Sequence, residues 1–598
     1  MVECSITSMQ TINSYLVIAG SDGAVRFYDF SLRLEAWFED FMAGPVTSLS
    51  FSAMNCPFPE GMGGEPGTTF WVPDFMIGTS EALIVGVESA VYDEVSPDDR
   101  RGTLLVQGMA ENVSDVCCHP HKTLVALSSY NGTLQVWDYD MKLLMNLREF
   151  NTKAKPQMTA LGAKKPKDVP FLRPQCITFD PSGMFLAVAF TTGDVKFLYS
   201  DSFEDAASYF FPDPLISLKF SPSGEYLAGY DAANHVVLLK RNTITAAPID
   251  DQDEENEEDS TIVVNKDAYI FIGRILSHSS IISGIDFGVK ESGETLVSVG
   301  EDRRCVEYDL HSSSVKDGIR IVEQGRIRVE LTAQPTAVSW HPHIGDDVED
   351  RFIVVNDEFK FKEFNSDSKQ CRKTTLAPTF GGPPNKLMIQ KGDDEKYYFV
   401  YSTTERIVGI GSLPLTGCPT QVMGLVAHPG KIAATCLSND GKFLFTAGGA
   451  DLTIGMWAVN FNALPPLPSA DDNGKDISSF LDMLDGGNGG DLHNDIIDYF
   501  YLCQLRTQGE DAMGDRAIKG LIHVDEISAL SRAIGFYPTE EEIENMCNEI
   551  RYKNFMITGE AQDELSIEEF IKLYVNHRPV NPLNSNEIDN AFEVIEEK

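Results

Sequence analysis

Basic residues are scarce in this sequence. Its 598 residues include 48 Lys and Arg against 90 Asp and Glu, which gives a formal net charge of −42 at pH 7. A protein that holds nucleic acid through phosphate contacts needs a basic surface, and a field of this sign repels polyanions unless a local patch overrides it. The same argument disfavours an anionic membrane surface. We therefore expect neither nucleic acid nor membrane as a partner.

Long apolar runs are missing as well. No stretch approaches the ~20 residues that a membrane-spanning helix needs, and the first residues, MVECSITSMQ, lack the charged and apolar regions of a secretory signal. The eleven cysteines include no C-x-x-C pair, so neither a zinc module nor a secreted disulfide framework is indicated. These features predict a soluble intracellular protein with free thiols.

Motifs that carry catalysis are also absent. There is no G-x-x-x-x-G-K-[ST] loop, and Gly409-Ile-Gly411 lacks both a third glycine and a strand–helix context. His119, His341 and His428 each precede a proline at the same point of a repeat, which indicates a structural role. We expect no enzymatic activity and no cofactor.

What the sequence does contain is a recurring phrase of strand, Pro/Gly turn, strand, Gly-Asp turn and strand. The clearest copies begin at Cys176 and Leu215, and looser ones end at Trp137-Asp138 and Met456-Trp457. Alternating apolar residues bury one side of each strand, and an Asp in the second turn can bind neighbouring strands. Over roughly the first 460 residues the pattern resembles the WD40 family, which implies β-propeller blades.

Nine repeats are counted. Residues 1–95 are predicted to be two blades of an incomplete first propeller, and residues 96–460 a seven-bladed WD40 propeller. Because the last repeat runs straight into Asn462-Ala-Leu-Pro-Pro, Thr103–Gln107 is expected to supply its fourth strand and close the ring. A single irregular ring is the alternative. The fold class is mainly β, with an all-α lobe at the C-terminal end.

Two insertions interrupt the repeats. Residues 250–259 contain eight acidic side chains, and the simplest interpretation is a solvated loop. Residues 151–168 carry the opposite charge and are a candidate contact for an acidic surface such as a tubulin tail, although these charges could equally serve solubility. The candidate partner-binding lysines are Lys153, Lys155, Lys164, Lys165 and Lys167.

After a linker at 461–490 the apolar spacing becomes helical. Helices are expected at 491–506, 523–534, 539–552 and 567–576, and this spacing is typical of an EF-hand pair over 491–579, followed by a tail at 580–598. A hard cation needs oxygens at positions 1, 3, 5 and 12 of the loop, with Gly at position 6. Asp515, Gly520 and Glu526 fit positions 1, 6 and 12 of the first loop, but Ala517 and Lys519 occupy positions 3 and 5. The second loop, ending at Glu569, is also degenerate, so weak calcium binding at most is expected.

An EF-hand-like lobe can hold an amphipathic partner helix in an apolar groove. The candidate groove residues share helical spacing and apolar character, although most would serve equally as the core of the lobe: Leu530, Ile534, Phe536, Met546, Phe570 and Leu573.

The C-terminal hundred residues carry a closer resemblance. The segments 498–509, 532–538 and 574–579, behind repeats that end in Gly-Met-Trp, resemble the cilia- and flagella-associated protein 251 family. The resemblance implies a tandem-propeller axonemal scaffold of cilia and flagella. It further implies a subunit of the calmodulin- and spoke-associated complex, with calmodulin among its partners, at the base of radial spoke 3 on doublet microtubules, where it supports motility.

Two alternatives use the same elements differently. Tandem propellers also occur in microtubule-binding proteins of the echinoderm type, which would require a basic face. A calcium-responsive regulator would require intact EF loops. The charge and the degenerate loops favour the non-enzymatic scaffold.

Overall fold

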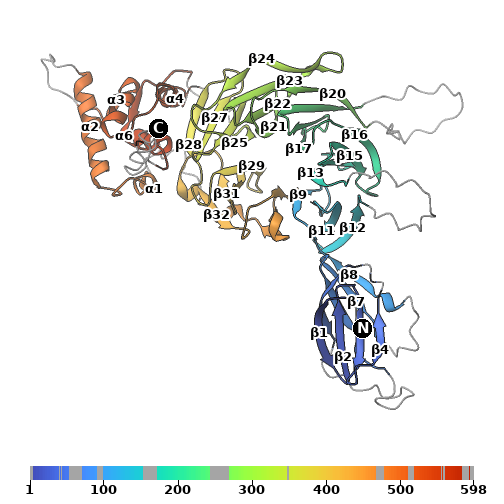
Figure 1. The fold of residues 1–598 in the computed structure, drawn as a ribbon. Coiled ribbons are helices and arrows are strands. Elements are labelled where there is room, and N and C mark those ends of the chain that lie inside the picture. The colour runs from blue at the N-terminus through green and yellow to red at the C-terminus, as the bar shows by residue number, and fades with distance from the viewer. Residues whose placement is uncertain are drawn as a thin grey trace, which may run out of the picture. The chain divides into compact units, whose positions relative to one another are not determined.

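The computed structural model describes residues 4–39, 41, 43–52, 70–89, 99–151, 171–242, 268–345, 349–465, 477–508, 518–553, 555, 559–581 and 592. The chain forms two compact units, Met1–Val113 and Ser114–Lys598, and consists mainly of antiparallel sheets (Figure 1). None of the helices in the described residues is long and apolar enough to cross a membrane.

The first unit holds two four-stranded sheets, ordered β1-β2-β3-β4 and β5-β6-β7-β8. Their inner faces share one apolar core, in which Phe27, Phe38 and Phe75 meet edge to face. The strands are β1 (Ile6–Ile12), β2 (Tyr15–Gly20), β3 (Val25–Asp29), β4 (Leu34–Phe38), β5 (Val46–Phe51), β6 (Phe75–Thr79), β7 (Leu83–Val87) and β8 (Thr103–Gln107).

Before the C-terminal helices, the described residues of the second unit form seven antiparallel sheets in chain order, six of four strands and a last one of three, β33-β34-β35. The first three sheets are β9 (Val113–Cys118), β10 (Leu124–Ser129), β11 (Thr133–Asp138), β12 (Leu143–Glu149); β13 (Pro174–Phe179), β14 (Phe185–Phe190), β15 (Asp194–Tyr199), β16 (Asp205–Phe210); and β17 (Leu215–Phe220), β18 (Tyr226–Asp231), β19 (His235–Arg241), β20 (Tyr269–Leu276).

The other four sheets are β21 (Ile282–Lys290), β22 (Gly293–Gly300), β23 (Arg304–Ser314), β24 (Gly318–Arg328); β25 (Pro335–His341), β26 (Arg351–Asn356), β27 (Lys360–Asn365), β28 (Cys371–Leu376); β29 (Pro384–Lys391), β30 (Tyr397–Thr403), β31 (Ile407–Ser412), β32 (Val422–Val426); and β33 (Ala434–Leu437), β34 (Phe443–Ala447), β35 (Ile454–Ala458).

The repeated phrase of the sequence accounts for these sheets. In the copy that begins at Cys176, the middle strand β14 is buried along its whole length. The turn that follows places Gly193 at φ +90°, which a side chain would strain, and Asp194 accepts a hydrogen bond from Thr192 Oγ1 at 2.6 Å.

The last sheet of this unit contacts the first. Cys118 on β9 and Cys436 on β33 lie with their sulfurs 3.2 Å apart, and the ring of Tyr139 lies 5.2 Å from that of Phe445 on β34. The first and last repeats therefore meet.

The fourth strand expected for the last sheet is placed differently. Thr103–Gln107 is β8, and it pairs with β7 in the first unit, with Leu83 opposite Gln107. The expectation that it closes the last sheet was wrong. Strand β7 is much nearer to β8 in the chain than the last sheet is, so pairing with β7 closes a shorter loop. In this pair, Ile84 lies opposite Val106, which continues the apolar pattern of the sheet.

Buried histidines fix two of the sheets. His428 contacts Asp451 (2.8 Å) and Thr446 (2.8 Å), and Trp457 donates to the same Thr446 hydroxyl (2.9 Å). His278 likewise contacts Asp302 (2.9 Å) and Ser298 (2.7 Å), which in turn contacts the Tyr308 hydroxyl (2.9 Å). Both histidines are buried side chains that join neighbouring strands through these hydrogen bonds.

The C-terminal elements are α1 (Ser478–Leu481), α2 (Asp491–Thr507), β36 (Leu521–His523), α3 (Ile527–Ala533), α4 (Glu540–Arg551), β37 (Glu564–Ser566) and α6 (Ile567–His577). Four of the helices lie where the sequence predicts helices. Thr539 with Glu542 and Ser566 with Glu569 form capping boxes, which fix the starts of α4 and α6. We call residues 477–581 the lobe.

One apolar core runs through the lobe. It includes Ile496 and Phe500 of α2 and Ile550 of α4, and also Phe480 and Leu484, which belong to the segment expected as a linker. The chain before α2 is thus part of the helical core. Burial of the apolar side chains of Phe480 and Leu481 stabilises the short helix α1.

Candidate functional site at the junction of the lobe and strand β28

The lobe packs against the edge of one sheet. Helices α4 and α6 contact β28, the outer strand of the sheet β25-β26-β27-β28, and Figure 1 shows α4 and α6 next to β28. An edge strand presents unpaired backbone groups that need partners. Here the partners come from the lobe.

Two backbone amides of β28 donate to lobe side chains. Thr374 N lies 3.2 Å from Glu549 Oε2 on α4, and Leu376 N lies 3.1 Å from Asn576 Oδ1 on α6. The imidazole of His577 contacts the same Glu549 oxygen at 3.0 Å, which holds the carboxylate in place. The helices therefore take the position that a further strand would occupy at this edge.

A buried lysine fastens the C-terminal end of α6. Lys360 on β27 is only 5% exposed, and its Nζ donates to the carbonyl oxygens of Asn576 and of Arg578, the latter at 2.7 Å. The last carbonyls of a helix have no partners within it and attract cations. Burial and the charge of Arg578 lower the pKa of Lys360 to about 7.

Further contacts extend this junction. The guanidinium of Arg372 lies 4.7 Å from the centre of the Tyr552 ring, and Arg578 donates to the Met483 carbonyl. Gly417 approaches Asn576 so closely that a Cβ would lie 1.9 Å from Oδ1, and its φ of +71° favours glycine as well. The junction thus joins sheet, lobe and the segment around α1 in one packed unit.

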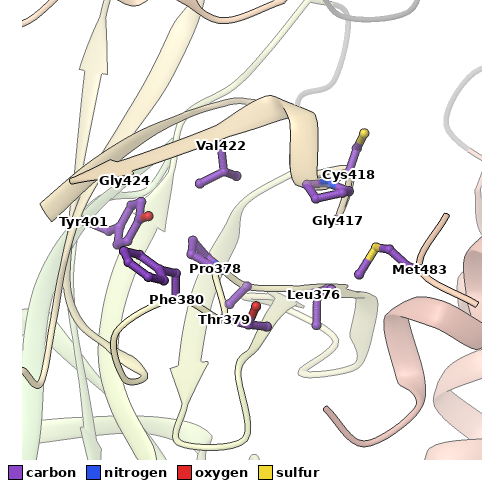
Figure 2. A pocket seen from close by; sticks show the side chains of 12 residues that line it. Leu376, Pro378, Thr379, Phe380, Tyr401, Gly417, Cys418, Val422, Gly424 and Met483 are labelled. Atoms are coloured by element: carbon purple, nitrogen blue, oxygen red, sulfur yellow. The ribbon is translucent and has the colours of Figure 1, made fainter. Parts of the chain in front are cut away.

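A cavity of about 180 Å³ lies beside the junction. Figure 2 shows Phe380, Tyr401 and Val422 on its sheet side and Met483 on its lobe side. Its other lining residues are mostly small or apolar: Leu376, Ala377, Pro378, Thr379, Gly417, Cys418, Pro419 and Gly424. Burial raises the pKa of Tyr401 well above its ordinary value, so the phenol stays protonated. A cavity lined in this way suits an apolar group.

The candidate groove residues lie mostly inside the lobe. Leu530, Met546 and Phe570 are fully buried and Leu573 is 2% exposed, whereas Ile534 and Phe536 are partly buried against the same core. A partner helix could touch the four buried residues only if the lobe opened. The sequence could not distinguish core from groove, because both need the same apolar spacing.

The glutamates at position 12 of the two loops expected to be degenerate in calcium ligands are in ion pairs. Glu526 pairs with Arg506, and Glu569 Oε1 lies 2.6 Å from Lys553 Nζ. Burial would raise the pKa of Glu569, but hydrogen bonds from Lys553 and the Ser566 amide outweigh it and lower the pKa. Gly520 has a φ of +72°, and Asp515 lies outside the described residues. No group of three or more His, Cys, Asp or Glu suited to a metal occurs in the described part of the chain.

The short strands β36 and β37 join these two loops. Ile522 pairs with Leu565, and both side chains are buried in the lobe core. The candidate lysines Lys153, Lys155, Lys164, Lys165 and Lys167 lie outside the described residues. Sequence reasoning missed Lys360, Glu549 and Asn576, because each is remote in the chain from the residues it contacts.

Comparisons with known proteins match both the strand repeats and the C-terminal region. Residues 491–598 match the family model "CFAP251 C-terminal domain", and residues 102–138 and 419–458 match the WD domain, G-beta repeat. The chain is 32% identical, over 99% of its length, to cilia- and flagella-associated protein 251 of Tetrahymena thermophila, of which it covers 60%. The protein of the same name from Mus musculus is 31% identical over 99% of the chain and is covered to 43%.

The protein of that name from Chlamydomonas reinhardtii is 27% identical over 98% of the chain, which covers 57% of it. The chain thus spans about half the length of these curated relatives. The names and family models describe a WD-repeat protein associated with cilia and flagella, and none of them names an enzyme.

Proposed function

We propose that this chain is a non-enzymatic scaffold of the axoneme in the cilium or flagellum. It is related over nearly its whole length to cilia- and flagella-associated protein 251. Its task is to hold partners at fixed positions. The observation that carries this proposal is the junction at β28, where Glu549, Asn576 and Lys360 fasten the lobe to a sheet. A lobe held in this way offers partners one extended surface.

The finer assignment follows the family resemblance. We propose a subunit of the calmodulin- and spoke-associated complex at the base of radial spoke 3 on doublet microtubules, supporting motility, with other subunits of that complex and calmodulin as partners. The seven sheets from Val113 to Ala458 are proposed to be the blades of a seven-bladed WD40 propeller, since their first and last members meet and both match the WD domain. The first two sheets are proposed to be blades of an incomplete propeller.

The lobe is proposed to be EF-hand-like without a resident cofactor. Two helix pairs whose loops pair through β36 and β37 support the first statement. The engagement of Glu526 and Glu569 by Arg506 and Lys553 supports the second, with weak calcium at most. This argues against the calcium-responsive alternative.

The proposal is tested in a ciliated cell that lacks its own copy of the relative. The tagged chain is expressed there, axonemes are purified, and the tag is located by electron tomography. A tag at the base of one radial spoke in each repeating unit of the axoneme, together with recovery of swimming, supports the proposal. A tag spread evenly along microtubules contradicts the spoke assignment, and a tag that stays in the soluble fraction contradicts an axonemal scaffold.

A further inference from the structure

A cluster of arginines lies on one face of the sheet β21-β22-β23-β24. In the antiparallel pair β23 and β24, Arg304 is directly opposite Arg328, and Arg326 is opposite Val306. Residues two apart on a strand share a face. Arg304, Arg326 and Arg328 therefore lie on the same face, within about 4.5–8 Å of one another at their Cβ atoms. We call these three residues the arginine face.

The neighbouring acidic groups are engaged by other partners than the side chains of this face. The Asp302 carboxylate is engaged by His278 at 2.9 Å and by the Ser279 amide at 3.0 Å. Glu301 contacts the Ser280 hydroxyl at 3.5 Å. Within the described part of the chain, neither Arg304 nor Arg326 is in an ion pair, and both side chains are exposed.

The guanidinium of Arg328 is held in place. Its Nε donates to the Glu330 carbonyl at 2.9 Å and its Nη2 to the Leu331 carbonyl at 3.0 Å, where Arg303 Nη1 also donates at 2.7 Å. The guanidinium groups of Arg303 and Arg328 thus both donate to the Leu331 carbonyl oxygen, and neither of these hydrogen bonds is to a carboxylate. The effect of the positive field reaches His278: burial lowers its pKa, Asp302 opposes this, and Arg326 and Arg304 lower it further.

Two exposed apolar side chains belong to the segment around His278, the residue whose pKa Arg326 and Arg304 lower. Leu276 at the end of β20 is 57% exposed and Ile281 just before β21 is 56% exposed. Strands β20 and β24 contact one another, as Figure 1 shows for these neighbouring outer strands. His278 and Ser280, which contact Asp302 and Glu301, lie between the two apolar residues in the chain. Guanidinium groups bind carboxylates, and the exposed apolar side chains can contact apolar residues. A surface with both features fits a peptide better than a free anion.

We propose that the arginine face, with Leu276 and Ile281, binds an acidic segment of a partner protein, whose carboxylates pair with Arg304 and Arg326 and whose apolar side chains cover Leu276 and Ile281. The overall charge of −42 excludes a long nucleic acid at the same face, since it would repel the rest of the polyanion. This surface is separate from the junction at β28, so its failure would leave the scaffold proposal standing.

The test uses the full chain and a fluorescein-labelled peptide of eight glutamates and one leucine, followed by fluorescence anisotropy in 50 mM salt. The variant R304Q/R326Q is compared with R320Q, which removes one charge from the same strand β24, where Arg320 pairs instead with Asp317. The double variant is expected to weaken binding about tenfold or more, and R320Q by less than about twofold. A third variant, L276S, is expected to weaken binding of this peptide but not of octaglutamate.

Three results would overturn the proposal. One is the absence of binding to the wild-type chain up to millimolar peptide. Another is equal weakening by R304Q/R326Q and R320Q, which would mean non-specific attraction. The third is binding of a phosphoserine peptide of the same length at least ten times tighter than the glutamate peptide, which would assign the face to phosphate.

Discussion

The Nζ atom of Lys360 lies 2.7 Å from the carbonyl oxygen of Arg578, across 218 residues of chain. It joins a sheet strand to the end of the last helix, and its removal leaves two buried carbonyls without a donor. We expect K360M, which keeps the unbranched side chain but removes the amine, to cost about 1–3 kcal/mol in the stability of the junction. Hydrogen exchange of β28 and of the end of α6 should become faster.

The matched control is K396M, because Lys396 is an exposed lysine whose nearest acidic contact is Asp394 at 3.6 Å. Its exchange should stay unchanged. Equal protection of α6 in K360M and in the wild type would show that this lysine does not hold the lobe.

The depressed pKa of Lys360 also predicts a dependence on pH. In the folded protein its pKa is lowered to about 7, from the ordinary 10.5. Between these values the unfolded chain binds the extra proton, so the stability that this residue contributes increases as pH rises, by up to about 1.4 kcal/mol per pH unit. The neutral amine keeps two hydrogens for the two carbonyls.

Urea unfolding of the helical signal at pH 7 and pH 9 measures this effect. The free energy of unfolding of the wild type minus that of K360M should be larger at pH 9. An unchanged or smaller difference would contradict the assigned pKa.

Gly417 offers a backbone test of the same junction. An added Cβ would lie 1.9 Å from Asn576 Oδ1, at a φ of +71°. We expect G417A to cost at least about 1–2 kcal/mol from backbone strain alone, and to expose β28 further through displacement of Asn576. Gly430 supplies the control G430A, because a Cβ added there would meet no atom within 4 Å and its φ is not positive. Limited proteolysis between sheet and lobe should increase for G417A only.

Local patterns predicted the elements well. The phrase beginning at Cys176 became β13–β16, and the helix expected at 491–506 is α2. His428 was assigned a structural role from its place before a proline, and the structure shows its contacts with Asp451 and Thr446. Such features depend on neighbours a few residues away, where periodicity and turn chemistry decide the outcome.

Contacts between distant residues could not be predicted. A lysine in a strand is ordinarily exposed, and nothing near Lys360 in the sequence indicates that Asn576 and Arg578 will cover it. Thr103–Gln107 was assigned to the wrong sheet for the related reason that an apolar strand fits any edge of suitable register. The arginine face depends on the register of β23 against β24, which places Arg304 opposite Arg328.

Calcium should not bind tightly to the lobe. Glu526 and Glu569 are paired with Arg506 and Lys553, and Ala517 and Lys519 stand where oxygen ligands are needed. Isothermal titration of the full chain with calcium should give no heat in the micromolar range. R506Q/K553Q, which frees both carboxylates, should remain silent too, because the missing oxygens are not restored. Micromolar heat from the wild type would make the lobe a sensor.

The arginine face makes a prediction about stability that needs no ligand. Like charges directly opposite in an antiparallel pair destabilise it by about 0.2–1 kcal/mol, so R304Q should raise the free energy of unfolding in urea by about that amount at low salt. R320Q should leave it unchanged or lower it slightly, since Arg320 contacts Asp317. Salt screens the repulsion, so the gain of R304Q should shrink at 0.5 M NaCl. If R304Q instead destabilised the chain at both salt concentrations, Arg304 would have an attractive partner in the free protein, and the face would not be waiting for an acidic segment.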